Sequence, residues 1–226
     1  MENAFTGLGP LLLTLKLAFV TTAALLLIGT PIAWWLAVTK SKIKPVFEAI
    51  VALPLVLPPT VLGFYLLILL GPNGALGSFW VSITDEALTF SFTGLVIASI
   101  VYSFPFVVQP LQSAFESLGH ELLEAAATLG ASPRDAFFSI AIPLARRGFL
   151  TATIMGIAHT LGEFGVVLMV GGNIPGETRV ISIAIYDQVE MLNYTAAHQM
   201  SLVLIALAFS AMLGLYVFNR RKPLYE

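Results

Sequence analysis

The sequence contains no cysteine, and only 11% of its 226 residues carry a formal charge. Without cysteine the chain can form neither a disulfide framework nor a thiolate metal site. The charged fraction is about half that of a soluble globular domain, whereas 58% of the residues are hydrophobic. The net charge is −2, and the basic residues form no stripe, which argues against a nucleic-acid partner. These values indicate that water is not the main solvent of this chain.

A nucleotide-binding loop is also missing. Lys40-Ser41 is the only lysine followed by serine or threonine, and Trp34 and Thr39 occupy the two positions where a phosphate-binding loop needs glycine. His159 and His198 are poor metal ligands, because no further ligand lies at a suitable spacing. The chain is therefore expected to bind no cofactor itself, and any ATP must be handled by another polypeptide.

Long apolar runs dominate what is present, and the mean hydropathy is +0.90. A spanning helix needs roughly 20 apolar residues to cross about 30 Å of hydrocarbon. Pro72-Asn73-Gly74 predicts a turn that ends the second helix near Leu70, and the fourth run must tolerate Glu163. We therefore predict an all-α membrane protein with five transmembrane helices, within residues 17–39, 49–84, 87–115, 148–172 and 191–219.

The basic residues orient these spans, because lysine and arginine concentrate in cytoplasmic loops. Nine of the 11 fall in three clusters on one side of a five-span alternation: Lys40, Lys42 and Lys44; Arg134, Arg146 and Arg147; Arg220, Arg221 and Lys222. The N-terminus is therefore predicted outside and the C-terminus inside. Residues 178–193 contain an apolar run, from Val180 to Ile185, that is too short to span, which predicts a short outer-face or re-entrant helix.

Residues 113–147 form the one long hydrophilic connection, predicted to be cytoplasmic, and they carry helix signals. Small and apolar side chains recur at i, i+3, i+4 and i+7, which predicts a short amphipathic helix over Leu122, Ala125, Ala126 and Leu129. Gly130 is expected to cap it in the left-handed conformation. Ser132 is predicted to cap a second helix with Pro133 and Asp135 in its first turn, and Pro143 is predicted to end that helix.

This segment resembles the EAA loop of binding-protein-dependent ATP-binding-cassette permeases. The matching residues are Glu124-Ala125-Ala126, Gly130 four positions later, and Ile140-Ala141-Ile142-Pro143, where Ile142 replaces the family's leucine. The resemblance implies a type I importer permease fold, one permease domain over residues 1–226, and no enzymatic activity. It also implies that the loop 113–147 docks on an ATPase subunit through Glu124, Ala125, Ala126, Leu129, Gly130 and Pro143. The alternative is an amphipathic helix lying on the membrane surface.

Two places within the spans are candidates for the translocation path or its gate. Pro58, Pro59 and Thr60 interrupt the second span, and such breaks line a path or serve helix packing. Glu163 is the sole formal charge within a span, and its exposure to lipid would cost at least about 2.5–3.5 kcal/mol. A structural or gating role is expected for it, with hydrogen bonds from His159 or Thr160, or with Arg179 as a basic partner.

A further resemblance concerns the cargo. The segments 161–165, 171–178 and 183–187, with Gly162-Glu163-Phe164-Gly165 at their start, are similar to the molybdate permeases of this family. That resemblance implies molybdate as substrate, with tungstate as a co-substrate, in a multi-pass protein of the bacterial inner membrane. It also implies three protein partners: a separate ATPase, an extracytoplasmic molybdate-binding protein and a second copy of the chain. The alternatives are a sulfate or thiosulfate permease, an ATP-independent anion channel or carrier, and a membrane scaffold.

Overall fold

The computed structural model describes residues 7–219, and all regular elements within this range are helices. Three of them are long and apolar enough to cross a membrane: α1 (Leu8–Val38), α5 (Phe92–Glu116) and α12 (Tyr194–Asn219). Two bent pairs bring the number to five if each pair counts as one span. The predicted basic cluster at 220–222 lies outside the described residues.

The first helix is longer than predicted, because it begins at Leu8 rather than near Leu17. Lys16 precedes the predicted span 17–39, yet it lies inside α1. Its ammonium group is 4.3 Å from the centroid of the Phe92 ring. A cation over an aromatic face is stabilised by the ring quadrupole. This contact helps to explain why a lysine is tolerated within the helix.

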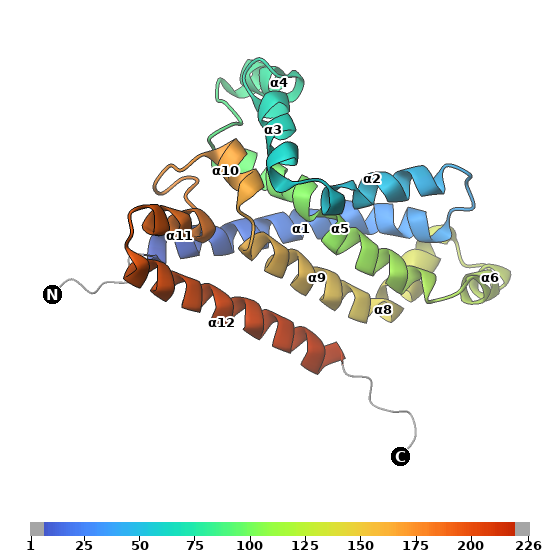
Figure 1. Ribbon diagram of the computed structural model, residues 1–226. Coiled ribbons are helices and arrows are strands. Elements are labelled where there is room, and N and C mark those ends of the chain that lie inside the picture. The colour runs from blue at the N-terminus through green and yellow to red at the C-terminus, as the bar shows by residue number, and fades with distance from the viewer. Residues whose placement is uncertain (1–6, 220–226) are drawn as a thin grey trace.

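The centre of the molecule is the bundle of α1, α5 and α9 (Arg146–Leu161), with α2 (Lys44–Val56) and α12 along its flanks (Figure 1). Small residues let these helices approach closely. A Cβ on Gly148 would lie 2.2 Å from Ala114 Cβ, and one on Gly156 would lie 2.9 Å from Val107 Cγ2. Membrane helices associate through such packing, because lipid tails are as apolar as leucine.

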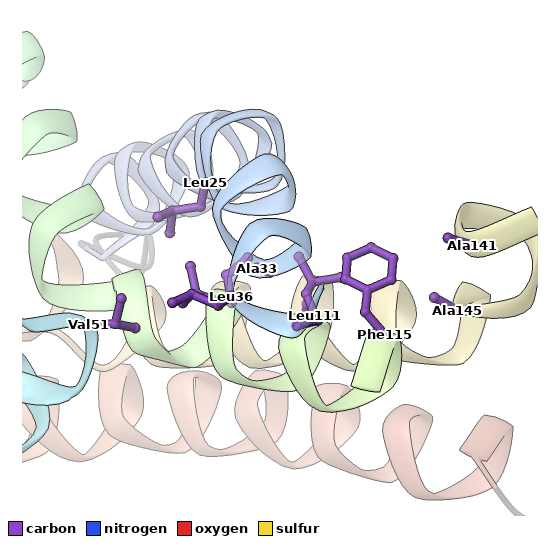
Figure 2. Close-up of a cluster of buried hydrophobic side chains, with 12 residues drawn as sticks. Leu25, Ala33, Leu36, Val51, Leu111, Phe115, Ala141 and Ala145 are labelled. Carbon is purple, nitrogen blue, oxygen red and sulfur yellow. The ribbon is translucent and has the colours of Figure 1, made fainter. Parts of the chain in front are cut away.

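A cluster of buried apolar side chains joins this bundle to the segment that follows α5 (Figure 2). Leu36 of α1, Val51 of α2 and Phe115 of α5 belong to it, together with Ala141 and Ala145. Trp34 packs edge-on against Phe115, with their ring centroids 5.2 Å apart. The segment 113–147 is therefore anchored to the bundle at both of its ends.

The second apolar run is not one straight span. It forms α2 and α3 (Pro59–Leu70), which meet at an angle of 110°. The break falls at Leu57–Pro58, as the prolines predicted, because Pro59 begins a new helix. Glycine and proline at 71–74 then turn the chain into α4 (Ala75–Thr84), and α3 and α4 project from the side of the bundle (Figure 1).

The fourth apolar run is also interrupted, which corrects the prediction of one helix over 148–172. Helix α9 ends at Leu161, and α10 (Gly165–Gly171) begins after a three-residue break that contains Glu163. Gly162 and Gly165 flank this break, and glycine weakens a helix by about 1 kcal/mol relative to alanine. The helix expected within 178–193 is confirmed as α11 (Ile181–Glu190).

The segment 113–147 folds as α6 (His120–Thr128), α7 (Pro133–Asp135), the π-helical η1 (Ala136–Ala141) and α8 (Ile142–Leu144). The prediction that Pro143 ends the second helix is wrong by one residue. Proline is tolerated in a first helical turn, where its missing N–H is not required, and Pro143 lies in the first turn of α8, which begins at Ile142. The chain then bends by 70° into α9 at Ala145.

Candidate functional site

Glu163 lies in the break between α9 and α10 and is only 3% exposed. Its carboxylate accepts a hydrogen bond from the hydroxyl of Ser99 (Oε2, 2.5 Å) and another from the hydroxyl of Ser103 (Oε1, 2.5 Å), both on α5. The backbone carbonyl of Glu163 accepts a third bond from Ser182 of α11, also at 2.5 Å. The break is therefore tied to two other helices through one residue.

Ser103 joins the carboxylate to α9. Its hydroxyl donates to Glu163, and its Oγ also lies 2.8 Å from His159 Nδ1 and 3.2 Å from Thr160 Oγ1. His159 Nδ1 is in turn 3.5 Å from Glu163 Oε1. The imidazole, the hydroxyls and the carboxylate form one satisfied cluster.

Two aromatic residues of α5 fix the plane of the His159 ring. Phe106 stacks on it with the ring centroids 3.8 Å apart and the planes inclined by 22°. Tyr102 lies on it at 4.7 Å with a tilt of 60°. Because its nitrogen is bonded and its face is stacked, the imidazole has little freedom to rotate. The side chain of His159 is 16% exposed, whereas that of Glu163 is 1% exposed.

A cavity of about 490 Å³ adjoins this cluster. Its lining brings together three of the four residues predicted from the sequence as path or gate, Pro59, Thr60 and Glu163, and adds Tyr102 and His159. The fourth, Pro58, immediately precedes them as the N-cap of α3. Pro59 and Glu163, which lie about 100 residues apart in the sequence, therefore line the same cavity.

Close packing of α3 against α10 forms one wall of this region. A Cβ on Gly165 would lie 3.0 Å from Pro59 Cβ, and one on Gly63 would lie 2.9 Å from Met169 Cβ. Both glycines therefore allow an approach that a larger residue would prevent. The two helix breaks, one at Pro58–Pro59 and one at 162–164, are held side by side by this contact.

Of the three partners expected for Glu163, His159 contacts the carboxylate directly. Thr160 is linked to the carboxylate only through Ser103. Arg179 does not contact it. Arg179 Nε instead donates to Asn173 Oδ1 at 2.5 Å and lies 3.6 Å from Asp187 Oδ2. These two contacts hold the Arg179 side chain in the loop before α11.

Ser99, Ser103 and Tyr102 were missed from the sequence. Their signal was present, because serines four apart in an apolar span share one face of the helix.

The loop around α6 is built differently. Leu129 is 89% exposed and Leu122 is 38% exposed, while Ala126 is buried at 8%. Glu124 and Ala125 are also exposed. The apolar face predicted for this helix is therefore largely uncovered in the single chain.

The end of α6 has the turn predicted at Gly130, whose φ is +87°. The N–H of Ala131 donates to the carbonyl of Ala126 at 3.0 Å, and that of Gly130 donates to Ala127 at 3.0 Å. This pair of bonds is the Schellman motif, which requires a left-handed residue at the position of Gly130. Ser132 and Asp135 then form the capping box of the next helix, with Ser132 as the predicted N-cap.

Comparison with known proteins places these features in a family. Residues 29–222 match the family described as binding-protein-dependent transport system inner membrane component. The molybdenum transport system permease protein ModB of Azotobacter vinelandii is 55% identical over 210 residues, which cover 93% of each chain. The protein of the same name in Escherichia coli K12 is 36% identical over 206 residues, with 89% of each chain covered.

Solved structures agree on the fold. The MetNI methionine ABC transporter in inward facing conformations gives a TM-score of 0.72 at 18% identity, covering 92% of both chains. A bacterial alginate ABC transporter in complex with a periplasmic protein gives 0.74 at 19% identity, covering 94% of this chain and 78% of that one. At these identities the likeness concerns the fold. The chain belongs to the family of binding-protein-dependent transport system inner membrane components, and it is a multi-pass membrane permease subunit.

Proposed function

We propose that this chain is the membrane-spanning subunit of an ATP-driven importer whose cargo is molybdate, with tungstate as a second substrate. The observation that carries the cargo assignment is the 55% identity to a molybdenum transport permease over nearly the full length of both chains. Glu163, the carboxylate of the buried cluster, lies within the segment 161–165, whose sequence resembles molybdate permeases. ATP hydrolysis belongs to a separate subunit.

The proposed topology has five spans, with the N-terminus outside and the C-terminus inside. In this arrangement α2 and α3 together form the second span, and α9 and α10 together form the fourth. The loop at residues 39–43 and the segment around α6 lie at the same end of the bundle (Figure 1), and Lys44 Nζ is 2.9 Å from Glu116 Oε1. Two basic clusters therefore share one end, which the positive-inside rule assigns to the cytoplasm.

The proposed mechanism is alternating access. The loop 113–147 docks on the ATPase through Glu124, Ala125, Ala126, Leu129 and Gly130, with Pro143 at its far end. Closure of two ATPase subunits moves the docked loops of two permease copies. The two copies then open the path outward to receive the oxyanion from its binding protein. Support for a docking role comes from the uncovered apolar face of α6. The cavity beside Glu163 is the part of the path within one copy.

The proposal is tested by uptake into proteoliposomes that contain the chain, its ATPase and the binding protein. We expect ATP-dependent accumulation of molybdate that tungstate inhibits. Uptake without the ATPase would favour a channel or carrier instead. Failure to accumulate any oxyanion despite ATP hydrolysis would favour a scaffold.

A sulfate permease is the second candidate, because a probable sulfate transport system permease protein of Anthoceros angustus is 32% identical and covers 92% of this chain and 70% of that one. Competition in the same vesicles separates the two candidates. Molybdate uptake that persists in excess sulfate supports the first, and sulfate accumulation that molybdate does not inhibit supports the second.

The docking role has its own test at Gly130. Replacing Gly130 with Asp adds a charge and a side chain at a residue whose φ is +87°. We expect a protein that inserts normally but no longer couples ATP hydrolysis to uptake. Gly130→Asn is the control, because asparagine tolerates the left-handed conformation without adding charge. Normal uptake by a well-expressed Gly130→Asp protein would contradict the role.

A further inference from the structure

Four polar side chains join the start of α2 to the end of α5 in a closed ring. Lys44 and Glu48 belong to α2, and Gln112 and Glu116 belong to α5. Lys44 Nζ lies 2.9 Å from Glu116 Oε1 and 3.6 Å from Glu48 Oε1. Gln112 Nε2 donates to both carboxylates, at 2.7 Å to Glu48 Oε1 and at 3.0 Å to Glu116 Oε1. Each helix contributes two residues one turn apart, so the ring holds the two helices in one register.

This polar ring lies where the chain leaves the bundle for α6. The carbonyl of Glu116 accepts a hydrogen bond from Gly119 N–H at 3.2 Å, and Gly119, with a φ of +75°, directly precedes α6. Lys44 and Glu116 also line a cavity of about 220 Å³ together with Leu123 of α6. Glu116 therefore contacts α2 with its side chain and the turn into α6 with its backbone.

The other end of α2 leads to the cavity at the helix breaks. After the break at Leu57–Pro58, Pro59 and Thr60 of α3 line that cavity. Within α2 itself, only Val51 and Pro54 are buried. Few apolar contacts therefore hold α2 on the bundle, and the polar ring ties its first turn to the end of α5.

We propose that Lys44 and Glu116 are positioning residues for coupling, because they make α2 move with α6 when the ATPase displaces the loop 113–147. Helix α2 passes this movement to the break that borders the cavity. The inference rests on the function proposed above. Lys44 and Glu116 act through the position of α2 and contact neither the cargo nor the nucleotide. Without the ring, α6 moves and α2 stays behind, so ATP is hydrolysed without opening the path.

The exposure of this ion pair favours a role in coupling over one in stability. The side chains of Lys44 and Glu116 are 26% and 42% exposed. Ion pairs at such exposure contribute little to the free energy of unfolding, because water screens them. The two residues are nevertheless 72 positions apart in the sequence and join two separate helices. Loss of the pair should therefore change coupling more than stability.

The test reverses the two charges one at a time and together, in the chain reconstituted with its ATPase and binding protein. Lys44→Glu and Glu116→Lys each bring like charges together, whereas the double variant restores opposite charges across the two helices. We expect each single variant to lower molybdate uptake per ATP hydrolysed by about 3- to 10-fold, and the double variant to recover to within about twofold of wild type.

Lys42→Glu is the matched control, because Lys42 is exposed in the neighbouring loop and lies outside the ring. This variant should keep uptake per ATP within about twofold of wild type. The midpoint of thermal unfolding in detergent should stay within about 3 °C for every variant, since the ion pair adds little stability. The ATPase should copurify with all of them, because the ring positions α2 and does not form the docking surface.

Three results would overturn the inference. Wild-type uptake per ATP in both single variants would show that the pair does not position α2 for coupling. A double variant no better than the single ones would show that the pairing itself is not required. Loss of the ATPase on copurification would place Lys44 or Glu116 in the docking contact instead. Absence of ATP-dependent molybdate uptake in wild-type vesicles would overturn the proposed function, and that outcome is distinct from a defect confined to the variants.

Discussion

The loop around α6 and the break around Glu163 are opposites in burial and in the origin of their stability. Leu129 of the loop is 89% exposed, whereas Glu163 is 3% exposed. The loop is shaped by bonds between near neighbours in the sequence, such as Ala131 N–H to the Ala126 carbonyl. The break is held by side chains from α5, 60 and 64 residues away.

This difference indicates which region needs a partner chain. A short helix with an uncovered apolar face gains little from its own protein, so its surface is available for another one. The polar cluster at the break is already satisfied within one chain, and changes there should alter the permease itself. Substitutions in the two regions should therefore separate stability from coupling.

The largest loss of stability is expected for Glu163→Leu. This change removes the acceptor of two buried hydroxyls, and each costs about 1–3 kcal/mol when left unpaired. The midpoint of thermal unfolding in detergent should fall by at least about 4 °C. Glu177→Leu, at an exposed loop position, is the control and should leave the midpoint nearly unchanged. Equal midpoints for the two variants would mean that the cluster contributes no stability.

A smaller loss is expected for Gly63→Ala in the wall between α3 and α10. The added Cβ would lie 2.9 Å from Met169 Cβ and 3.2 Å from Val166 Cα, and overpacking of this kind costs about 1–3 kcal/mol. Gly214→Ala in α12 meets no atom within 4 Å, and should raise stability by up to about 1 kcal/mol through helix propensity. Thermal midpoints should shift in opposite directions, and shifts of the same sign would argue against close α3–α10 packing.

A local effect is expected for Ser132→Ala, which removes the capping box before η1. The loss of such a cap costs about 0.5–2 kcal/mol. Because the site is exposed, the cost should appear as faster hydrogen exchange of the amides at 134–136, with little change in global unfolding. Ser210→Ala within α12 is the control, and unchanged exchange in the Ser132 variant would mean that the cap is not formed in solution.

The smallest change in stability, with a large loss of function, is expected for Leu129→Ser. A substitution at such an exposed residue changes the free energy of unfolding by less than about 0.5 kcal/mol. The ATPase subunit should nevertheless copurify poorly with the variant, because part of the proposed docking face is removed. Leu192→Ser, at a residue 71% exposed between α11 and α12, should retain the ATPase. Equal recovery of the ATPase with both variants would show that Leu129 does not contribute to the ATPase contact.

The sequence predicted features that depend on neighbouring residues. The left-handed turn at Gly130 and the cap at Ser132 follow from local backbone chemistry, and both are present. The break at Pro58–Pro59 was predicted for the same reason. Its angle of 110° was not, because the direction of α3 is set by its contact with α10, about 100 residues further along the chain.

The sequence did not predict features that depend on distant residues. Glu163 was identified as unusual by its charge, but its serine partners on α5 could only be found once the helices were placed together. The same limit explains the error at Arg179, which was near enough in sequence to be a candidate but is bound by Asn173 and Asp187. The interruption of the fourth span at 162–164 was likewise not predicted, and the backbone there is held by another helix, because Ser182 of α11 donates to the Glu163 carbonyl.

The proposed contact between α6 and an ATPase subunit can be tested directly, because the chain has no cysteine of its own. Leu129→Cys introduces a single thiol at the C-cap of α6, and Leu192→Cys introduces one in the loop between α11 and α12. A photo-crosslinker attached to each thiol would be activated in the assembled transporter. We predict that position 129 crosslinks to the ATPase subunit and that position 192 does not. Crosslinking to the ATPase from position 192, or none from position 129, would contradict the proposed docking surface and topology.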